Sequence, residues 1–512
     1  MNENILIDGN ILRRKNFIPI LQNMNKELIY RELVKISGSK NISNNSKVLG
    51  EFSKDLSFFS GKEPKYVIWP KNRKQIQKTI KLANSLNFSI IPVSSSSGPR
   101  HHGDTIPRNN QSVIVNLSKL NKIINLDRKN RVLMIEPGVT FGKLIPQLSK
   151  KGLRILTPLH PRASKSVLTA ALEREPVTIP RYMWDSSDPL LCTEVYFGNG
   201  ELFKTGAAAG PGTIKQQKKA GQAQVNPMGP TQFSPFRLIQ GAQGSIGIVT
   251  WVTLKLELKP SIQKVYHFQS NNIEDLLDIQ YDLLKYRLCD ELFILNNLNL
   301  ASLIKENSSD ISQLVKQLKK WNLIFIISGK GQLANERISY LEGDIQDIMK
   351  EKDIRSLITK TILEKDILKF INQADVNPWR LRLFGGYQDI FFISNYERIK
   401  EYIALVEQQI TENLGVYIQA INQGTSYHCE FDIYYNPNNK EETLKVKEQF
   451  LKISNDLIDS GAFFNRPYGL WAKEVYKKHE DSTQKALKKV KRIFDPKNVL
   501  NPGVLCFGNE TK

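Results

Sequence analysis

The stretch that decides the fold is IIPVSSSSGPRHHGDT, residues 90–105. A short apolar strand, predicted over 88–93, runs into four serines, a glycine, a proline, an arginine and two histidines. Small side chains leave backbone N–H groups accessible, and the serine hydroxyls and Arg100 add further donors. The loop is therefore suited to bind an anion, most simply a pyrophosphate. A plain turn without a ligand is the alternative, because serine- and glycine-rich loops often follow strands.

The composition is typical of a soluble globular protein, since 40% of the residues are hydrophobic and 24% are charged. A chain of 512 residues predicts two or three domains. It contains no apolar run of the ~18 residues that a transmembrane helix needs, and its first residues lack the ordered regions of a signal peptide. We therefore expect a cytoplasmic protein without a transmembrane segment.

The chain is strongly basic, with a net charge of +21. Such an excess attracts acidic partners, either a membrane surface or an acidic redox protein. The alternative is a general bias in composition, which the scattered positions of the lysines favour. No nucleic-acid-binding motif occurs, so nucleic acid is not an expected partner. Peripheral membrane contact and a homo-oligomer stay open.

The cysteines and histidines do not show the spacing of a metal site. The 4 cysteines lie far apart with no CxxC pair, and the 6 histidines include one adjacent pair but no HxxxH. These spacings exclude the usual zinc-ribbon and iron–sulfur motifs. We predict no metal site.

Alternating strands and helices surround the first loop. A strand at 66–69 precedes a helix that Asn72 can cap, with Gln75 at its third position. A second strand leads into the loop, and a third, at 112–117, follows it. The predicted order is strand, helix, strand, anion loop, strand.

Two further stretches carry glycine turns. RVLMIEPGVTFGKLIPQLSKKG (131–152) predicts a strand, a Pro-Gly turn and a helix that begins after Thr140. LIQGAQGSIGIVTWVTLKLEL (238–258) predicts a glycine-spaced turn that leads into a strand. Between them we expect a long ordered loop over 153–190 and a hairpin over 191–204.

The pattern changes near residue 260 and again near residue 460. Helical segments near 273–288, 335–350 and 397–412 alternate with strands near 323–328, 389–394, 416–421 and 427–435. This alternation suggests a separate α+β domain with an antiparallel sheet. A basic helix and the segment FDPKNVLNPG (494–503) follow it.

Several of these stretches, in this order, resemble the flavin-binding family of vanillyl-alcohol oxidase and p-cresol methylhydroxylase (PCMH) type. The family also contains D-lactate and glycolate dehydrogenases and alkyl-dihydroxyacetone-phosphate synthase. The matching pieces are PVSSSSGPRHHG (92–103) with VIVNLSKLNKI (113–123), then IEPGVTFGKL (135–144), QGAQGSIGIVTWVTLKL (240–256) and FDPKNVLNPG (494–503).

The resemblance implies an α+β fold in three parts. Residues 1–259 would form a two-lobed PCMH-type FAD-binding domain after an N-terminal helical segment. Residues 260–459 would form a cap domain with an antiparallel sheet, and residues 460–512 would return to the FAD domain.

FAD is the cofactor that the resemblance implies. The first loop would wrap its pyrophosphate, the two glycine turns would line the adenosine and pyrophosphate side, and Asn501 would lie near the flavin ring. The residues implied to contact the cofactor are Pro92, Ser94, Ser95, Ser96, Ser97, Gly98, Arg100, His101, His102, Gly103, Asp104, Pro137, Gly138, Val139, His160, Ser187, Gly241, Gly244, Ser245, Gly247, Ile248 and Asn501.

The chain departs from the family pattern at two places, which indicates a distinct subfamily. The first loop usually has an arginine and three glycines, whereas here Val93 precedes four serines and the loop is two residues longer. The second glycine-rich loop is replaced by LEREPVTIPRYMWDSSDP (172–189). Cofactor contacts there would come from Ser187, Trp184 or Arg174.

Histidines near the flavin raise the question of a covalent link, since some members of the family attach FAD to a histidine or tyrosine. His101 or His102 could carry such a link, or His102 could only hydrogen-bond a phosphate. His160 is a further candidate on the flavin side.

The best catalytic strand of the cap is SYHCEFDIYY (426–435), where His428 and Glu430 share one face. They could act as a base and the group that orients it, with His428 as the base because its usual pKa suits proton transfer near neutral pH. The alternative is an edge strand with its polar face in water. The D-lactate branch carries two histidines for a metal in this region, and this chain has one, so the resemblance also implies no metal.

FFNRPYGLW (463–471) adds Arg466 and Tyr468 as catalytic candidates. Arg466 could bind a substrate carboxylate through two hydrogen bonds or stabilise reduced flavin. A structural salt bridge at the domain junction is the alternative. Arg380 and Arg382 form a second basic pair that could meet the substrate.

The function that the resemblance implies is that of an FAD-dependent dehydrogenase. It would oxidise a small-molecule alcohol or 2-hydroxy acid by hydride transfer to flavin N5 and pass the electrons to a redox protein or a quinone. One alternative is ether-lipid chemistry like that of alkyl-dihydroxyacetone-phosphate synthase, which this chain's few cap histidines disfavour. Another is a non-catalytic flavin-binding subunit of an electron-transfer complex.

Overall fold

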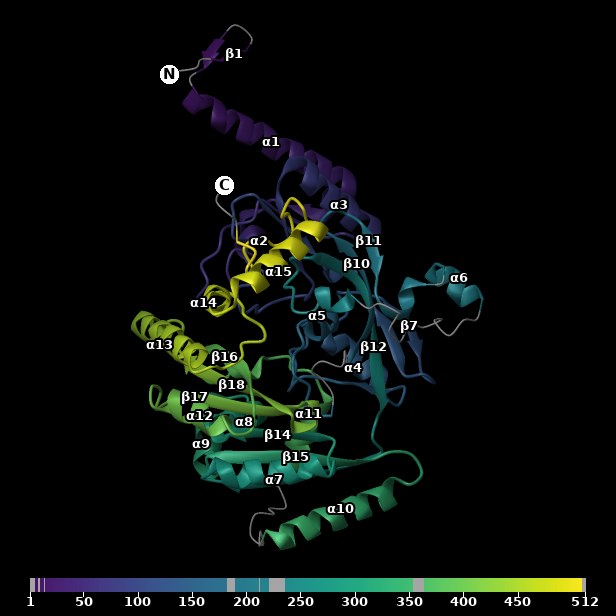
Figure 1. Ribbon diagram of the computed structural model, residues 1–512, viewed down its shortest axis with the longest axis vertical. Coiled ribbons are helices and arrows are strands. Elements are labelled where there is room, and N and C mark those ends of the chain that lie inside the picture. The colour runs from purple at the N-terminus through teal and green to yellow at the C-terminus, as the bar shows by residue number, and fades with distance from the viewer. Residues whose placement is uncertain are drawn as a thin grey trace.

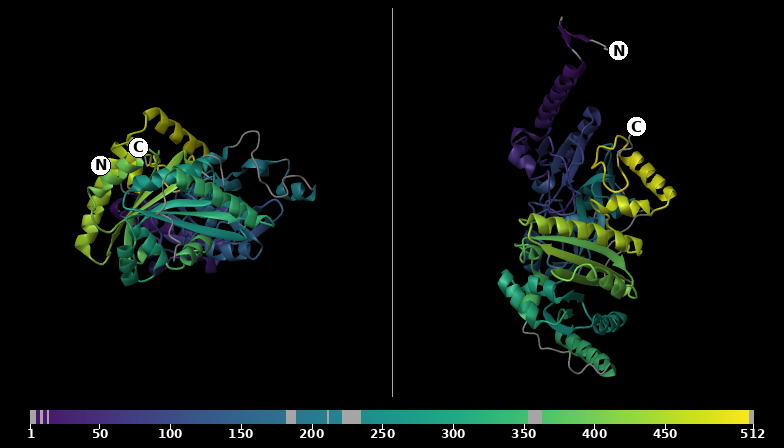
Figure 2. Two further views of the ribbon diagram at one scale, coloured as in Figure 1. Left: turned by 90° about the horizontal axis from the view of Figure 1, so that it is seen from below. Right: turned by 90° about the vertical axis from the view of Figure 1, so that its left-hand side faces the viewer.

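A computed structural model describes residues 5–7, 10–12, 14–181, 189–210, 212–220, 235–352 and 363–508. The molecule is elongated (Figure 1). Helix α1 (Arg14–Ser37) projects from one end, two packed sheets form the upper half, and a third sheet with its helices forms the lower half. The views in Figure 2 show the same arrangement, with the third sheet at the far end from α1.

The first lobe is a four-stranded sheet with the order β3-β4-β6-β5, in which β4, β6 and β5 run parallel. Helix α3 connects β4 to β5, and its N-cap residue Asn72 accepts a hydrogen bond from the Gln75 N–H, as predicted. Ile76, Ile80 and Ala83 are fully buried on its inner face. The order strand, helix, strand, loop, strand is therefore confirmed. The elements are β3 (Ile42–Ser43), β4 (Tyr66–Ile68), α3 (Arg73–Leu86), β5 (Ser89–Val93) and β6 (Ser112–Asn116).

The second lobe is an antiparallel sheet with the order β11-β10-β12-β8-β7, and β9 pairs with the far end of β12. The predicted hairpin forms from β10 and β11, and helix α4 begins at Phe141, directly after Thr140. Its elements are β7 (Ile123–Asp127), β8 (Val132–Ile135), α4 (Phe141–Ser149), β9 (Leu153–Ile155), α5 (Val167–Leu172), β10 (Leu190–Phe197), β11 (Leu202–Lys204), α6 (Ile214–Lys219) and β12 (Gly247–Leu258).

The prediction of a long ordered loop without regular elements over 153–190 is wrong at two points. The short strand β9 forms because Leu153 and Ile155 pair with the end of β12 and are buried. Helix α5 forms because the Ser166 side chain accepts a hydrogen bond from the Thr169 N–H and so caps a short apolar turn.

The cap sheet is fully antiparallel, with the order β13-β15-β14-β17-β18-β16. Because β18 lies between β17 and β16, it is not an edge strand. The elements are β13 (Ile262–Ser270), α7 (Ile273–Lys285), β14 (Glu291–Asn296), α8 (Asn297–Ile304), α9 (Ser308–Gln317), β15 (Trp321–Gly329), α10 (Ala334–Glu351), α11 (Glu364–Asn372), β16 (Gly386–Ser394), α12 (Ile399–Glu407), β17 (Leu414–Ile421), β18 (Ser426–Tyr435) and α13 (Lys440–Asp459).

The two faces of the cap sheet have different neighbours. Helices α7, α10, α12 and α13 pack on one face and form the largest apolar core of the molecule with it. Helices α8 and α11 cover part of the other face, where Phe293 and Tyr417 are buried. The rest of that second face points toward the first two lobes.

The chain returns to the first lobe at its C-terminal end, through α14 (Trp471–Lys477) and α15 (Asp481–Phe494). The N–H of Ile90 donates to Val499 (2.7 Å), and the N–H of Asn501 donates to Ile90 (2.8 Å), so this segment lies directly beside β5. Buried Lys491 adds hydrogen bonds to the carbonyls of Ser245 and Leu500. The first loop, the glycine turn and the C-terminal segment therefore meet at one place.

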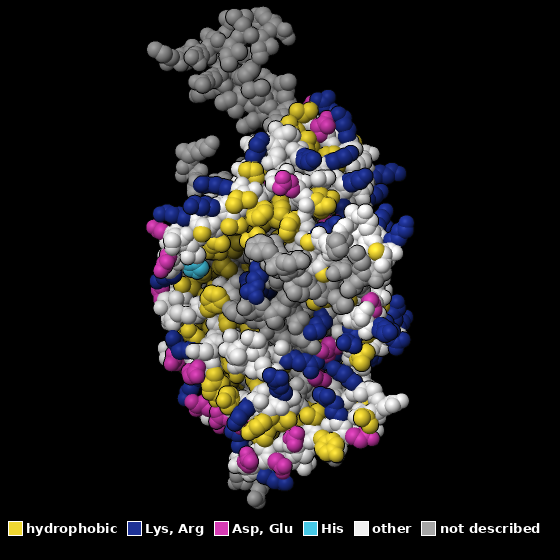
Figure 3. Space-filling view, turned by 45° about the vertical axis from the view of Figure 1, so that its right-hand side comes forward, with side chains coloured by type: hydrophobic (Ala, Val, Ile, Leu, Met, Phe, Trp, Pro, Cys, Tyr) yellow, Lys and Arg dark blue, Asp and Glu magenta, His cyan; other side chains and the backbone are white. Residues whose placement is uncertain are grey.

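The remaining elements are the hairpin β1 (Ile5–Ile7) and β2 (Asn10–Leu12) and the helix α2 (Ser46–Gly50). Among the described helices, none combines the length and apolar character needed to cross a bilayer. On the face shown in Figure 3, Lys and Arg side chains are spread over both halves and do not gather in one patch.

Candidate active site

A cavity of about 310 Å³ lies where the two FAD-side lobes meet the uncovered face of the cap sheet. The first loop, the turn at Pro137 and the glycine turn line one side, and strands β16, β17 and β18 line the other. Of the predicted site residues, those that line it are Pro92, Ser94, Ser95, Arg100, His101, His102, Asp104, Pro137, His160, Gly241, Gly244, Gly247, Ile248, Glu430 and Arg466.

The predicted residues of the first loop that do not line the cavity fix the loop's path. The N–H of Ser96 donates to the Ser164 carbonyl (3.0 Å), and the carbonyl of Ser97 accepts from Arg162 (3.0 Å). The N–H of Gly103 donates to the Asp55 carboxylate (2.7 Å). Gly98 continues this part of the loop. Arg100 lines the cavity, but its guanidinium lies over the Phe52 ring at 4.2 Å and donates to the Glu51 carbonyl.

Glycine is required where these loops approach one another. A Cβ on Gly244, where φ is +68°, would lie 2.5 Å from Pro92 Cγ. A Cβ on Gly138 would lie 2.5 Å from the Ser118 carbonyl oxygen. Val139 and Ser245, next to these turns, are fully buried behind the cavity wall.

Asn501 connects the loops from behind. Its Nδ2 donates to the carbonyls of Asp104 (2.8 Å) and Gln243 (2.7 Å), one in the first loop and one in the glycine turn. It does not line the cavity, so in this structure it positions both loops.

The cavity wall contains buried polar atoms without a hydrogen-bond partner among the described residues. They are His101 Nδ1, Thr105 Oγ1, Gln243 Oε1 and Arg466 Nε. Buried polar groups are normally satisfied, so unpaired donors and acceptors of both kinds fit a polar ligand with many acceptors and donors. The residues present therefore fit a dinucleotide cofactor such as FAD.

The segment that replaces the second glycine-rich loop contributes charged groups that were not predicted. Ser187 and Trp184 lie outside the described residues, and Arg174 sits against Gly241. Glu173 and Glu175 line the cavity, as does Lys165, which forms an ion pair with Glu175. No short-range motif in the sequence marked these three residues.

On the cap side, His428 and Glu430 are brought together as predicted. His428 Nε2 lies 3.0 Å from Glu430 Oε2. Arg380 forms ion pairs with Glu430 and with Asp432, the latter at 3.0 Å. Glu430 reaches the cavity, whereas His428 is 1% exposed and lies behind it. Arg382 does not line the cavity but pairs at 2.8 Å with Asp375, which does.

The Arg380 network sets the charge of these groups. Burial opposes ionisation of Glu430, but Arg380 and His428 outweigh it and hold the pKa of Glu430 at about 2. Burial, with a smaller contribution from the nearby Glu430, raises the pKa of Asp432 to about 8, although Arg380 opposes this shift. Burial lowers the pKa of His428, so its ring is neutral near pH 7.

Arg466 and Tyr468 follow the cap's return to the FAD side. Arg466 is 5% exposed, and its guanidinium stacks over the Phe391 ring at 4.2 Å. It forms no ion pair among the described residues. Tyr468 is buried away from the cavity and stacks on the His102 ring, with centroids 4.8 Å apart.

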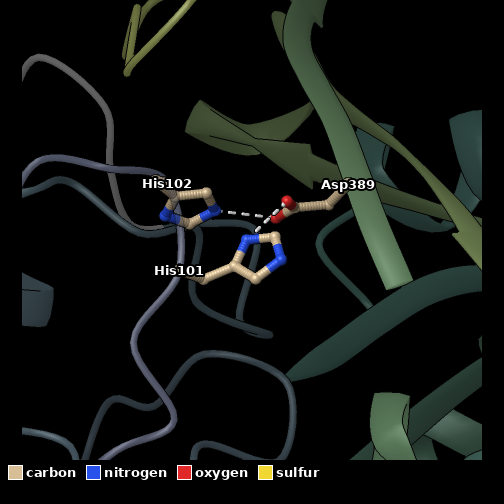
Figure 4. A group of neighbouring side chains, drawn as sticks. All are labelled: His101, His102 and Asp389. Atoms are coloured by element: carbon tan, nitrogen blue, oxygen red, sulfur yellow. Dashed lines mark hydrogen bonds and ion pairs between the residues drawn. The ribbon is translucent and has the colours of Figure 1, made fainter. Parts of the chain in front are cut away.

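The two histidines of the first loop meet a carboxylate that the sequence did not suggest (Figure 4). His101 Nδ1 lies 3.1 Å from Asp389 Oδ1, and His102 Nε2 lies 2.8 Å from Asp389 Oδ2. His160 also lines the cavity, but its Nδ1 faces the carbonyls of Phe370 (3.1 Å) and Gln373 (3.2 Å).

The comparisons with known proteins agree with this architecture. Residues 64–205 match the FAD binding domain model, and residues 395–505 match the model of the C-terminal domain of FAD linked oxidases. The solved structure of p-cresol methylhydroxylase with substrate bound superposes with a TM-score of 0.81 at 19% identity, covering 94% of this chain and 97% of that one. The chain has the fold of the PCMH-type flavoproteins, and two of its segments match FAD-linked family models.

Two curated relatives of the family cover nearly the whole chain. The 4-cresol dehydrogenase [hydroxylating] flavoprotein subunit of Pseudomonas putida is 23% identical over 84% of this chain and 85% of its own length. The glycolate oxidase subunit GlcD of Bacillus subtilis is 22% identical over 93% of this chain and 96% of its own length. The predicted α+β PCMH-type fold, the FAD cofactor and the class of FAD-dependent oxidoreductase are thereby confirmed.

Proposed function

We propose that this PCMH-type protein oxidises a small alcohol or 2-hydroxy acid that carries an anionic oxygen. The observation that carries the proposal is Arg466, a buried guanidinium on the cavity wall with no ion pair among the described residues. A buried cation is normally paired, so an anionic ligand is the natural partner. The relatives named for glycolate and 4-cresol support a substrate with an oxygen that ionises.

Bound FAD would accept a hydride at N5. We propose that Ser94, Ser95 and the glycine turn hold its pyrophosphate. Arg466 would orient the anionic oxygen of the substrate or compensate negative charge on the reduced flavin. Phe391, against which Arg466 stacks, fixes the guanidinium and keeps water from one of its faces.

The substrate's proton needs an acceptor, and we propose His428 with Glu430. The lowered pKa of His428 leaves its ring neutral and able to accept a proton, and Glu430, which reaches the cavity and lies 3.0 Å from Nε2, would orient the ring. His428 is the base, and Glu430 stabilises its protonated form.

We further propose that a redox protein or a quinone takes the electrons. The relative named as a flavoprotein subunit supports a protein partner, and the net charge of +21 would favour an acidic one. The three domain boundaries and the cytoplasmic location stay predictions.

Anaerobic flavin reduction tests the proposal. The purified holoenzyme is mixed with 2-hydroxy acids, 4-alkylphenols and matched neutral alcohols, and bleaching of the flavin band is followed. We expect bleaching by an anionic or phenolic substrate, and about a 10²-fold slower reduction in Arg466→Met at low substrate, since a lost charge contact costs roughly 3 kcal/mol.

Arg398→Met is the matched control, because Arg398 lies on the cap surface and interacts with Glu401. It should reduce its flavin at the wild-type rate. Absence of bleaching with every compound, or an Arg466→Met variant as fast as wild type, would contradict the proposal. A yellow pellet after acid precipitation would separately show a covalent flavin link.

A further inference from the structure

His101, His102 and Asp389 come from two distant parts of the chain and meet beside the cavity. The histidines belong to the first loop, and Asp389 belongs to strand β16, 287 residues after His102. One potential ligand atom from each residue lies within 4.8 Å of the others. In Figure 4 both rings point a nitrogen at the carboxylate.

The hydrogen bonding of His101 leaves this group short of positive charge. His101 Nε2 lies 3.2 Å from the Tyr387 carbonyl oxygen, which can only accept, so Nε2 carries the proton. In the neutral ring Nδ1 is then a lone pair, and it faces Asp389 Oδ1 at 3.1 Å. Nδ1 makes no aligned hydrogen bond among the described residues. Either a proton on Nδ1 or a metal ion between the two atoms resolves this contact.

No lysine or arginine supplies that cation among the described residues. The side chain of Asp389 is 10% exposed, and its ion-pair partners there are the two histidines. Glu430 and Asp432, on the neighbouring strand, share Arg380 instead. A buried carboxylate is normally compensated, so Asp389 depends on the two histidines, either through a proton or through a bound metal ion, where its neighbours have an arginine.

The rings are also held as metal ligands usually are. The Tyr387 ring stacks on the His101 ring, with centroids 4.5 Å apart and an interplanar angle of 3°. The backbone carbonyl of Tyr387 accepts the hydrogen bond from the protonated nitrogen of His101, Nε2. A carbonyl partner on the far nitrogen fixes the tautomer that offers the near nitrogen to a metal. Tyr468 stacks on His102, whose φ of +82° is a left-handed conformation that a histidine rarely adopts.

We propose that His101, His102 and Asp389 bind a divalent transition-metal ion, with zinc as the reference ion. Two imidazole nitrogens and one carboxylate oxygen are ligands that Zn²⁺, Mn²⁺, Fe²⁺ and Co²⁺ accept, and three protein ligands leave positions open. All three side chains line the cavity, so the open positions face the space where a ligand with an anionic oxygen can enter. This proposal is independent of the oxidation proposed above and replaces the prediction of no metal.

Metal binding by tag-free holoenzyme tests the inference without turnover. The protein is dialysed against a chelator, then titrated with Zn²⁺ by calorimetry and with Co²⁺ by visible absorption, and metal content is measured after gel filtration. We expect about one ion per chain and the absorption bands of a four- or five-coordinate Co²⁺ site. No uptake of Zn²⁺, Co²⁺ or Mn²⁺ by the wild-type holoenzyme would overturn the site.

Two variants and one control locate the ion. Asp389→Asn and His101→Gln should each lose the stoichiometric ion, or bind it at least 10²-fold more weakly. His479→Gln, which changes a histidine of the C-terminal segment that faces Tyr476, should bind like wild type. Flavin content and the circular dichroism spectrum confirm folding, and wild-type titration decides the proposal if a variant does not fold. Equal binding by wild type and folded Asp389→Asn would place the ion elsewhere.

Discussion

Two histidine–carboxylate groups lie beside the same cavity, and they are neutralised in different ways. On β18, His428 and Glu430 belong to a network in which Arg380 also pairs with Asp432. At the first loop, Asp389 meets His101 and His102, with no lysine or arginine among the described residues. The same residue types therefore form one group that is complete in the protein and one that is left to take a cation.

The register of the cap sheet explains why the two groups are so close and yet distinct. Asp389 lies directly opposite Asp432, and Phe391 lies opposite Glu430. Cross-strand partners share a face, so three carboxylates point to the same side of the sheet. Arg380 serves two of them, and the third turns to the histidines of the first loop. The difference shows that the position of one arginine separates a proton-handling network from a candidate metal site.

Removal of Arg380 should have the largest effect. Arg380→Met leaves Glu430 and Asp432 buried without their cation, and loss of one partner of a buried ion pair costs about 3–5 kcal/mol. The free energy is measured from hydrogen exchange of the β18 amides. Lys264→Met is the control, because Lys264 pairs with Glu342 at the surface and should cost less than about 1 kcal/mol. A loss below 1 kcal/mol in Arg380→Met would show that the β18 group is not held by its arginine.

A matched pair of amide variants tests the comparison directly. Glu430→Gln removes a charge-assisted partner of Arg380 and should cost about 2–3 kcal/mol. Asp389→Asn, in metal-free protein, removes a carboxylate without an arginine and should cost about 1 kcal/mol or less. Both are measured by hydrogen exchange on β16 and β18. If Asp389→Asn costs as much as Glu430→Gln, the two groups do not differ as described.

The sequence predicted the groups that local pattern can reveal. His428 and Glu430 are two residues apart on one strand, so period-two alternation placed them on one face. The first loop was predicted because small residues after an apolar strand expose backbone, and the ordered set of similar stretches connected it to the glycine turn. The ordered stretches therefore predicted the fold of the FAD side.

Asp389 could not be predicted, because its role depends on strand pairing across the cap. In GYQDIFFIS it is one polar residue in an apolar strand, and no spacing connects it to the first loop. The antiparallel pairing of β16 with β18 turns it toward the cavity. Glu173 and Glu175 were missed for a related reason, since they lie in the segment where the chain departs from the family pattern, and Lys165, just before that segment, was missed because no short-range motif marks it.

The two groups should also have opposite pH dependences. Burial lowers the pKa of His428 below its unfolded value near 6.5, so the folded ring stays neutral and wild type loses stability as the pH falls through that value. Burial opposes protonation of His101, but Asp389 and Asp55 outweigh it and raise its pKa. In metal-free protein that stabilisation is complete below about pH 6.5 and is lost as the pH rises through the folded pKa.

The stability differences between wild type and the variants His428→Gln and His101→Gln should therefore change with pH in opposite directions. The stability difference between wild type and His428→Gln should shrink below about pH 6.5, and that for His101→Gln should shrink above it, each by up to about 1.4 kcal/mol per pH unit. Thermal unfolding between about pH 5 and 9 measures both. Zinc should reverse the His101 slope, because a metal needs the ring deprotonated and binds more tightly as the pH rises. A His101 slope that zinc leaves unchanged would mean that a proton, and not a metal ion, neutralises the first-loop group.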